Sequence, residues 1–178
     1  MANPGEEAFS GQTFEGRTFD KLDLNGRDLS GAIFIDCRFN NCDLSNVKVN
    51  GCAFRGVGFA GCKLVGVDFS RINPLLLAWE FKKSKLALCN FGNLKLKGSR
   101  FIECALQGCD FHRADLAGAD FTLADMQSSN FSEAILEKAD FCGAFNYYID
   151  PRAVKIKGAK FSYPEVLALL APFGVKVE

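Results

Sequence analysis

The stretch "GCDFHRADLAGADFTLADM", from Gly108 to Met126, has a large apolar residue at every fifth position. These residues are Phe111, Leu116, Phe121 and Met126. A helix repeats its apolar face about every 3.6 residues and a strand every 2 residues, so a strict period of five fits neither element. The pattern therefore predicts a chain built by stacking short repeated units.

The same period extends in both directions along the chain. It runs from Phe9 to Phe69 and again from Leu76 to Phe141, and no central position in either run is polar. The residue two before each central residue is small in almost every unit. Seven of the eight cysteines occupy that position, namely Cys37, Cys42, Cys52, Cys62, Cys89, Cys104 and Cys109. One large and one small side chain per unit should face inward, and the other three should face water.

Over about residues 7 to 145 the chain resembles the pentapeptide-repeat family, whose members wind four five-residue units into each square turn of a right-handed β-helix. The resemblance implies an all-β fold, a right-handed quadrilateral parallel β-helix with a stacking period of 20 residues. At the usual strand spacing, about seven turns make a rod on the order of 32 Å long. The expected core columns are Leu24, Leu44 and Leu64, and Phe81, Phe101, Phe121 and Phe141.

The C-terminal segment has a different pattern. We expect residues 1–161 to form the β-helix, with a register break near 70–80, and residues 162–178 to form a helix and tail. Ser162 and Glu165 around Pro164 predict a capping box and the start of a short capping α-helix. Its apolar residues exceed what one helix face needs, so we expect a homodimer through this cap, as the family resemblance also implies. The dimerisation residues would be Val166, Leu167, Leu169, Leu170 and Phe173.

The repeat is interrupted once, where two residues are inserted between Phe69 and Leu76. Two interpretations remain open. The insertion is either a bulge or kink whose apolar residues fill the local core, or an exposed apolar loop that contacts a partner. Leu75, Leu77 and Trp79 are the candidate partner-binding residues in the second case.

The residue types that usually carry chemistry are explained by the repeat. His112 falls on an outward position without a partner, and no cysteine pair has CxxC spacing, so the cysteines should be buried thiols that pack as small side chains. Asp110, Asp115 and Asp120 fall on successive sides of a turn, where carboxylates accept backbone N–H bonds at the corners. We therefore expect no enzyme activity, no cofactor and no metal site.

Length and charge favour one soluble domain with a protein partner. The chain has 178 residues and a net charge of zero, from 21 basic and 21 acidic residues, which gives no global attraction to nucleic acid or membrane. No apolar stretch is long enough to span a bilayer and no secretory signal is visible, so we expect a cytoplasmic protein. Charge is uneven along the rod, with a basic stretch from Lys82 to Arg100 and an acidic one from Glu103 to Asp140.

The resemblance also suggests a function. One group of pentapeptide-repeat proteins protects DNA gyrase and topoisomerase IV from quinolones by imitating duplex DNA, and this chain is similar to them in length, in its interrupted repeat and in its terminal helix. It departs from their acidic character. A topoisomerase would contact the acidic turns, for which the candidates are Asp110, Asp115, Asp120 and Asp140. The alternative is a general scaffold or adaptor that binds another protein and has no topoisomerase role.

Overall fold

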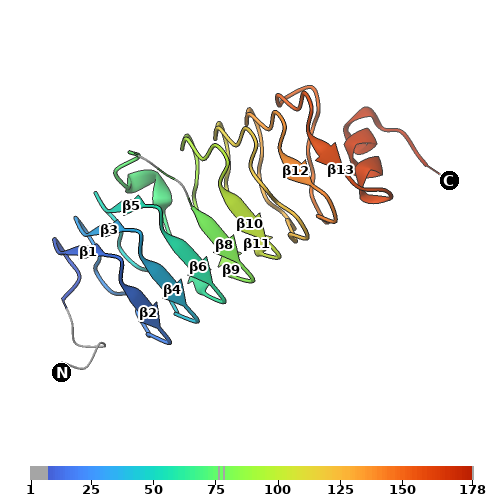
Figure 1. Ribbon diagram of the computed structural model, residues 1–178. Helices are drawn as coiled ribbons and strands as arrows, with labels where there is room; N and C mark the ends of the chain where they lie inside the picture. Colours follow the sequence, from blue (N-terminus) through green and yellow to red (C-terminus); the bar gives the residue numbers. More distant parts are fainter. Residues whose placement is uncertain (1–7, 76, 78, 178) are drawn as a thin grey trace.

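In the computed structural model, which describes residues 8–75, 77 and 79–177, the chain winds into a right-handed, four-sided parallel β-helix of about seven turns (Figure 1). Each side of a turn holds one five-residue unit, so the strands are two or three residues long. The strands are β1 (Thr13–Glu15), β2 (Thr18–Asp20), β3 (Ile33–Ile35), β4 (Arg38–Asn40), β5 (Ala53–Arg55), β6 (Gly58–Ala60), β7 (Lys63–Val65), β8 (Glu80–Lys82), β9 (Lys85–Ala87), β10 (Arg100–Ile102), β11 (Ala105–Gln107), β12 (Asp140–Phe141) and β13 (Lys160–Phe161). Two 3-10 helices, η1 (Phe69–Arg71) and η2 (Glu165–Phe173), complete the fold.

The four sides of the rod are faces A to D. Face A carries β1, β3 and β5, and later the bridges from Lys95 through Asp115 to Lys155. Face B carries β2, β4, β6, β8 and β10, followed by β12 and β13. Face C carries β7, β9 and β11, and continues through Asp125 to Phe145. Face D has no strand in the described part of the chain and is held by bridges such as Asp68 with Asn90.

Columns of identical side chains fill the axis. On face B the rings of Phe81, Phe101, Phe121 and Phe141 stack nearly parallel, with centroids 5.2, 5.1 and 5.0 Å apart. Leu24, Leu44 and Leu64 form the corresponding column on face C, and all seven side chains are buried. Parallel strands place equivalent residues directly above one another, so one sequence position is repeated along the whole interior.

The register break appears as a change in pairing distance. Phe39 pairs with Phe59 twenty residues later, whereas Phe59 pairs with Phe81 after twenty-two. The two extra residues are accommodated in η1 and the segment after it, which projects from the row of turns in Figure 1. The sheet of face A ends at β5 at this level. The central residue expected at Leu76 lies outside the described residues.

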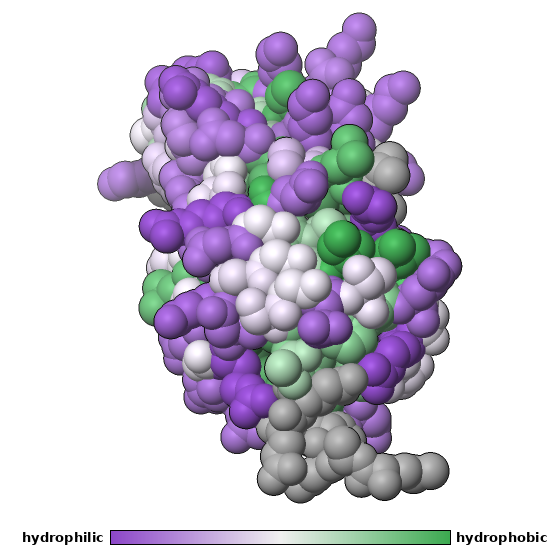
Figure 2. Space-filling view, turned by 90° about the vertical axis from the view of Figure 1, so that its left-hand side faces the viewer, coloured by the Kyte–Doolittle hydropathy of each residue, from purple (hydrophilic) through white to green (hydrophobic). Residues whose placement is uncertain are grey.

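The first turn closes the N-terminal end of the rod. The position two before Phe19 holds Arg17, where the last turns have small residues such as Ser99, Ala119 and Ala139. Its guanidinium lies 5.3 Å from the ring centroids of both Phe14 and Phe19, a cation–π arrangement that covers the exposed end of the aromatic column. Figure 2 looks onto this end and shows white and green surface in the middle with purple at the rim.

The C-terminal end is closed by η2, which confirms the expected short helix near the C-terminus but differs from the expectation in two details. The cap is a 3-10 helix instead of an α-helix, and Ser162 makes no capping box, because Pro164 is the N-cap and has no side-chain capping bond. Ser162 is still part of the turn-to-turn ladder. Its hydroxyl accepts a bond from the Gly143 N–H at 2.8 Å while its carbonyl accepts from the Val166 N–H. The side chain is therefore engaged by the turn below.

Phe121→Ala removes one ring from the middle of the face B column. Phe121 is fully buried between Phe101 and Phe141, so the loss of packing and the cavity should lower the free energy of unfolding by about 3–5 kcal/mol. Urea unfolding followed by circular dichroism measures this change. The control, Phe145→Ala, removes a ring that is 41% exposed and should cost well under half as much; equal costs would contradict the role of the column.

Candidate functional site

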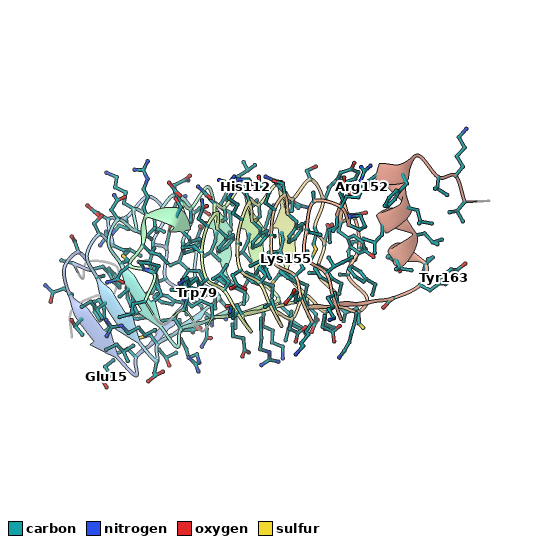
Figure 3. The ribbon with its side chains drawn as sticks, turned by 90° about the horizontal axis from the view of Figure 1, so that it is seen from above. Glu15, Trp79, His112, Arg152, Lys155 and Tyr163 are labelled. Carbon is teal, nitrogen blue, oxygen red and sulfur yellow. The ribbon has the colours of Figure 1, made fainter. Side chains whose placement is uncertain are left out.

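The break in the rod has a buried part and an exposed part. Leu77 is 7% exposed and Trp79 is 2% exposed, whereas Leu75 is 56% exposed. The Trp79 ring meets Phe54 edge-on and Phe69 at a tilt, with centroids 5.9 and 5.2 Å away, and Figure 3 shows Trp79 within the rod. The interpretation as an exposed loop is therefore wrong for Leu77 and Trp79, which fill the core left open by the insertion.

Trp79 also supplies a hydrogen-bond donor to a backbone carbonyl at the break. Its indole Nε1 donates to the Phe54 carbonyl at 3.0 Å, at the point where the face A sheet ends. A buried carbonyl without a donor is costly, so the indole stabilises the break as well as filling it. What remains at the surface is Asn73, Pro74 and Leu75, which line a hollow of about 390 Å³ together with Asn93 and Lys95.

The cysteines perform the same task elsewhere in the rod. The thiol of Cys37 donates to the Phe14 carbonyl at 3.4 Å, and that of Cys62 donates to the Phe39 carbonyl at 3.2 Å. In each case the thiol lies one turn above a central carbonyl that points inward. Burial raises the pKa of Cys52 to about 12, which keeps that thiol protonated. Sequence reasoning treated these residues as small apolar side chains and missed their role as donors.

The candidate aspartates sit at the corners as expected. An Oδ1 atom of Asp110 accepts the His112 N–H at 3.0 Å, and the same bond to the residue two later recurs at Asp115, Asp120 and Asp140. The aspartates are spread over three faces, with Asp115 on face A, Asp120 and Asp140 on face B, and Asp110 on face D.

Their charges are largely paired with cations of neighbouring turns. Asp115 lies 3.2 Å from Lys97 and Asp140 lies 3.2 Å from Lys160. Asp120 lies 3.8 Å from Arg100, which also contacts Glu80 at 2.9 Å. The basic and acidic stretches are thus stacked onto each other, and surface pairs of this kind reduce the local field more than they stabilise the fold.

Hydrogen bonds and charge act together on these carboxylates. Bonds from Cys142 lower the pKa of Asp140, and Lys160 adds to the effect. A bond from Arg113 likewise lowers the pKa of Glu133. The ion pairs were missed from the sequence because they join residues a full turn apart, although the twenty-residue period was enough to align them.

His112 has a partner, contrary to expectation. Its Nδ1 lies 2.9 Å from the Oγ of Ser132, which is directly above it in the next turn. Ser132 also borders a hollow of about 320 Å³ lined by Ser128, Tyr148 and Asp150, among others. Among residues 8–75, 77 and 79–177, no group of three His, Cys, Asp or Glu side chains could hold a metal ion.

The C-terminal cap leaves apolar side chains uncovered. Val166, Leu167, Leu169 and Leu170 are all half-buried, and Phe173 is 53% exposed. Arg152 fixes the end of the cap, since its guanidinium lies 5.0 Å from the Phe173 ring centroid and donates to the Pro172 carbonyl at 3.1 Å. Figure 3 shows Arg152 beside η2. The described part of the chain contains no helix of the length and apolarity needed to cross a membrane.

The sequence matches the family described as pentapeptide repeats (8 copies) over residues 23–59, 84–122 and 109–145. The chain belongs to the pentapeptide-repeat family. The matched segments lie on both sides of the break, and residues 60–83, which contain the break, lie outside them. Among curated proteins, none matches the chain.

Two solved structures of QnrB1 are similar to this chain in fold. A trypsin-treated variant of QnrB1, a plasmid-mediated fluoroquinolone resistance protein, has a TM-score of 0.59 and 21% identity, over 96% of this chain and 93% of its own. A second such variant has a TM-score of 0.51 and 24% identity, over 96% and 92%. HetL, from the cyanobacterium Nostoc sp. strain PCC 7120, has 16% identity and a TM-score of 0.32, over 85% and 86%.

Trp79→Phe tests whether the break is held by the indole bond. The substitution keeps an aromatic ring in the core and leaves the Phe54 carbonyl without its donor, so the free energy of unfolding should fall by about 1–3 kcal/mol. Leu75→Ser is the control, because the exposed side chain should change stability by less than about 0.5 kcal/mol. The bond has no structural role if both variants unfold at the same denaturant concentration in circular dichroism.

Proposed function

We propose that this chain is a non-enzymatic protein-binding rod that binds a type II topoisomerase, DNA gyrase or topoisomerase IV, and changes its response to quinolones. The observation that carries the proposal is the similarity of fold to QnrB1 over nearly the whole length of both chains. A rod whose interior is filled by stacked side chains has only its sides, its break and its ends for contacts. The fold is thus suited to binding.

The contact would centre on the break. Asn73, Pro74 and Leu75 project there beside Asn93 and Lys95 and form the edge of a hollow. Asp110, Asp115, Asp120 and Asp140 lie along the rod in the following turns and would be secondary contacts. Because three of these four carboxylates are already paired with cations, we expect the affinity to depend less on salt than that of a uniformly acidic DNA mimic.

The paired charges also favour a second candidate function, that of an adaptor which binds another protein without imitating DNA. Negative potential comparable to a phosphate backbone requires unpaired carboxylates along one side. On face B, Asp120 and Asp140 are stacked but contact Arg100 and Lys160. An adaptor would use shape and apolar contacts instead.

A supercoiling assay with purified gyrase and a quinolone separates the two candidates. We expect micromolar protein to restore supercoiling in the presence of drug, and Leu75→Ser to weaken this effect because it removes the projecting side chain of the break. Leu88→Asn, which changes an exposed leucine on another side of the rod, should leave the effect intact. If the intact protein alters neither enzyme activity nor drug sensitivity, the topoisomerase proposal fails and the adaptor function stands.

We further propose that η2 joins two copies through Val166, Leu167, Leu169, Leu170 and Phe173. Sedimentation should give about twice the 19.5 kDa of one chain. Leu167→Glu combined with Leu170→Glu should give a monomer with an unchanged circular dichroism spectrum, because buried charges would oppose the contact. A monomeric intact protein at high concentration would show that the cap serves only to close the rod.

A further inference from the structure

Face C has few charged side chains in the turns after β9. Lys85 in β9 and the Lys83–Glu103 ion pair, 3.5 Å apart, mark its margin. Beyond them the outward side chains of face C belong to Ala87, Ala105, Gln107, Asp125, Gln127 and Phe145. Asp125 is the one ionisable side chain in that set, and it accepts a bond from the Asn146 amide at 2.8 Å. The ion pairs of the same turns lie on the other sides of the rod.

Exposed apolar side chains border this surface, which has a single carboxylate, on both corners. At the corner with face D, Leu88 is 69% exposed, and Tyr148, 61% exposed, lines a hollow with Ser128, the residue two turns above Leu88. At the corner with face B, Leu123 is 54% exposed, and Tyr163, two turns above it, is 81% exposed and projects from the rod in Figure 3. Phe145, 41% exposed, lies between the two corners. Leu88, Leu123, Phe145, Tyr148 and Tyr163 together form the C-face patch.

The two leucines are unfavourable for the fold in two respects. Both have left-handed backbone conformations, with φ of 54° at Leu88 and 59° at Leu123, a conformation that other corner residues such as Lys83, Glu103 and Arg113 also adopt. Both also expose a large apolar side chain to water. The exposed apolar side chain, and not the backbone conformation, distinguishes the two leucines from the other corner residues and points to a role outside folding.

Packing over the next turn does not require leucine. Each leucine side chain covers the glycine at the same corner of the next turn. If Gly143 carried a Cβ, that atom would lie 2.6 Å from Leu123 Cδ2, and a Cβ on Gly108 would lie 3.0 Å from Leu88 Cδ2. Elsewhere asparagine does the same at equivalent corners. Asn41 covers Gly61 and Asn46 covers Gly66, at 2.6 and 3.0 Å by the same measure. Because a polar residue suits this corner and its φ better, the leucines are explained by an apolar contact.

The dimensions of the patch fit a single helix. A three-residue strand is about 10 Å long and four stacked turns span about 14 to 19 Å, so the surface matches the 10 to 12 Å diameter of an α-helix and about 12 of its residues. The projected area of the patch is about 200 Å², which is far below the roughly 800 Å² per partner of a standard interface between two folded proteins. The patch alone is therefore too small for the interface of a second copy of the chain. The single carboxylate on this side, Asp125, is bonded to the Asn146 amide, and no cation lies on face C beyond Lys85, which disfavours a highly charged ligand because its charges would be desolvated without partners.

From these observations we propose that the C-face patch docks one amphipathic helix of a partner protein, with an apolar face in contact with Leu88, Leu123 and Phe145 and with the two tyrosines at its margins. Aromatic side chains, tyrosine among them, dominate the binding energy of many protein interfaces, which is consistent with the two tyrosines and Phe145 of the patch. This surface differs from both the break and η2, so the inference is independent of the topoisomerase and dimer proposals.

Selection from a displayed library of helix-forming peptides about 12 to 14 residues long, with the intact protein as bait, tests the proposal. Enriched peptides should repeat apolar residues at i, i+3 or i+4, and i+7 and carry little charge on that face. Fluorescence anisotropy with one labelled enriched peptide should then show that Leu88→Asn combined with Leu123→Asn weakens binding about tenfold or more. Thermal unfolding of this variant should be unchanged or occur at higher temperature, because asparagine tolerates the left-handed conformation better.

Leu75→Asn is the matched control, since Leu75 is similarly exposed at 56% but lies at the break; it should bind the peptide as the intact protein does. The proposal is overturned if no peptide is enriched, if the enriched peptides are extended or highly charged, or if binding survives the double substitution. It is also overturned if the double variant loses the dimer in sedimentation, because the patch would then belong to a second copy of the chain.

Discussion

The stacking register of twenty residues is the constraint on which the rest of the molecule depends. Parallel pairing places each residue directly over the one a turn earlier, as Phe101 lies over Phe81. The nearest surface neighbour of a side chain is therefore twenty positions away, and most of the ion pairs, including Lys63 with Asp43 and Arg113 with Glu133, have this spacing. The two-residue insertion lengthens the register once without breaking the column of rings, because Phe59 still stacks on Phe81 at 4.7 Å.

The same register favours small inward side chains that can donate a hydrogen bond. Several central carbonyls point inward and need a donor from the turn above, and the donor is a thiol at Cys109 and a hydroxyl at Ser84. Trp79 occupies the equivalent position at the break and uses its indole N–H. Cysteine combines small size with a thiol donor, which accounts for its frequency in a rod whose described cysteines are free and form no group that could hold a metal ion.

The sequence was sufficient for the features that repeat and insufficient for those that occur once. The period predicted the columns through Phe121 and the corner bonds of the aspartates, because each rests on local geometry repeated in every turn. The burial of Trp79 depended on a cavity that exists only where two residues are inserted. Similarly, Ser162 resembles a capping residue in sequence, but Gly143 in the turn below takes its hydroxyl as an acceptor.

The pairing of charges along the rod determines where binding specificity resides. With Asp115, Asp120 and Asp140 in contact with cations, faces A and B of the C-terminal turns present alternating charge that a strongly electropositive partner would not prefer. Affinity must then come from desolvation of apolar surface, which is non-directional and requires shape to confer selectivity. A straight stack offers distinct shape only where it is interrupted, at the projecting Leu75, or where corner side chains rise above the sides, at Leu88 and Leu123. Partner recognition by this rod therefore depends on departures from the repeat.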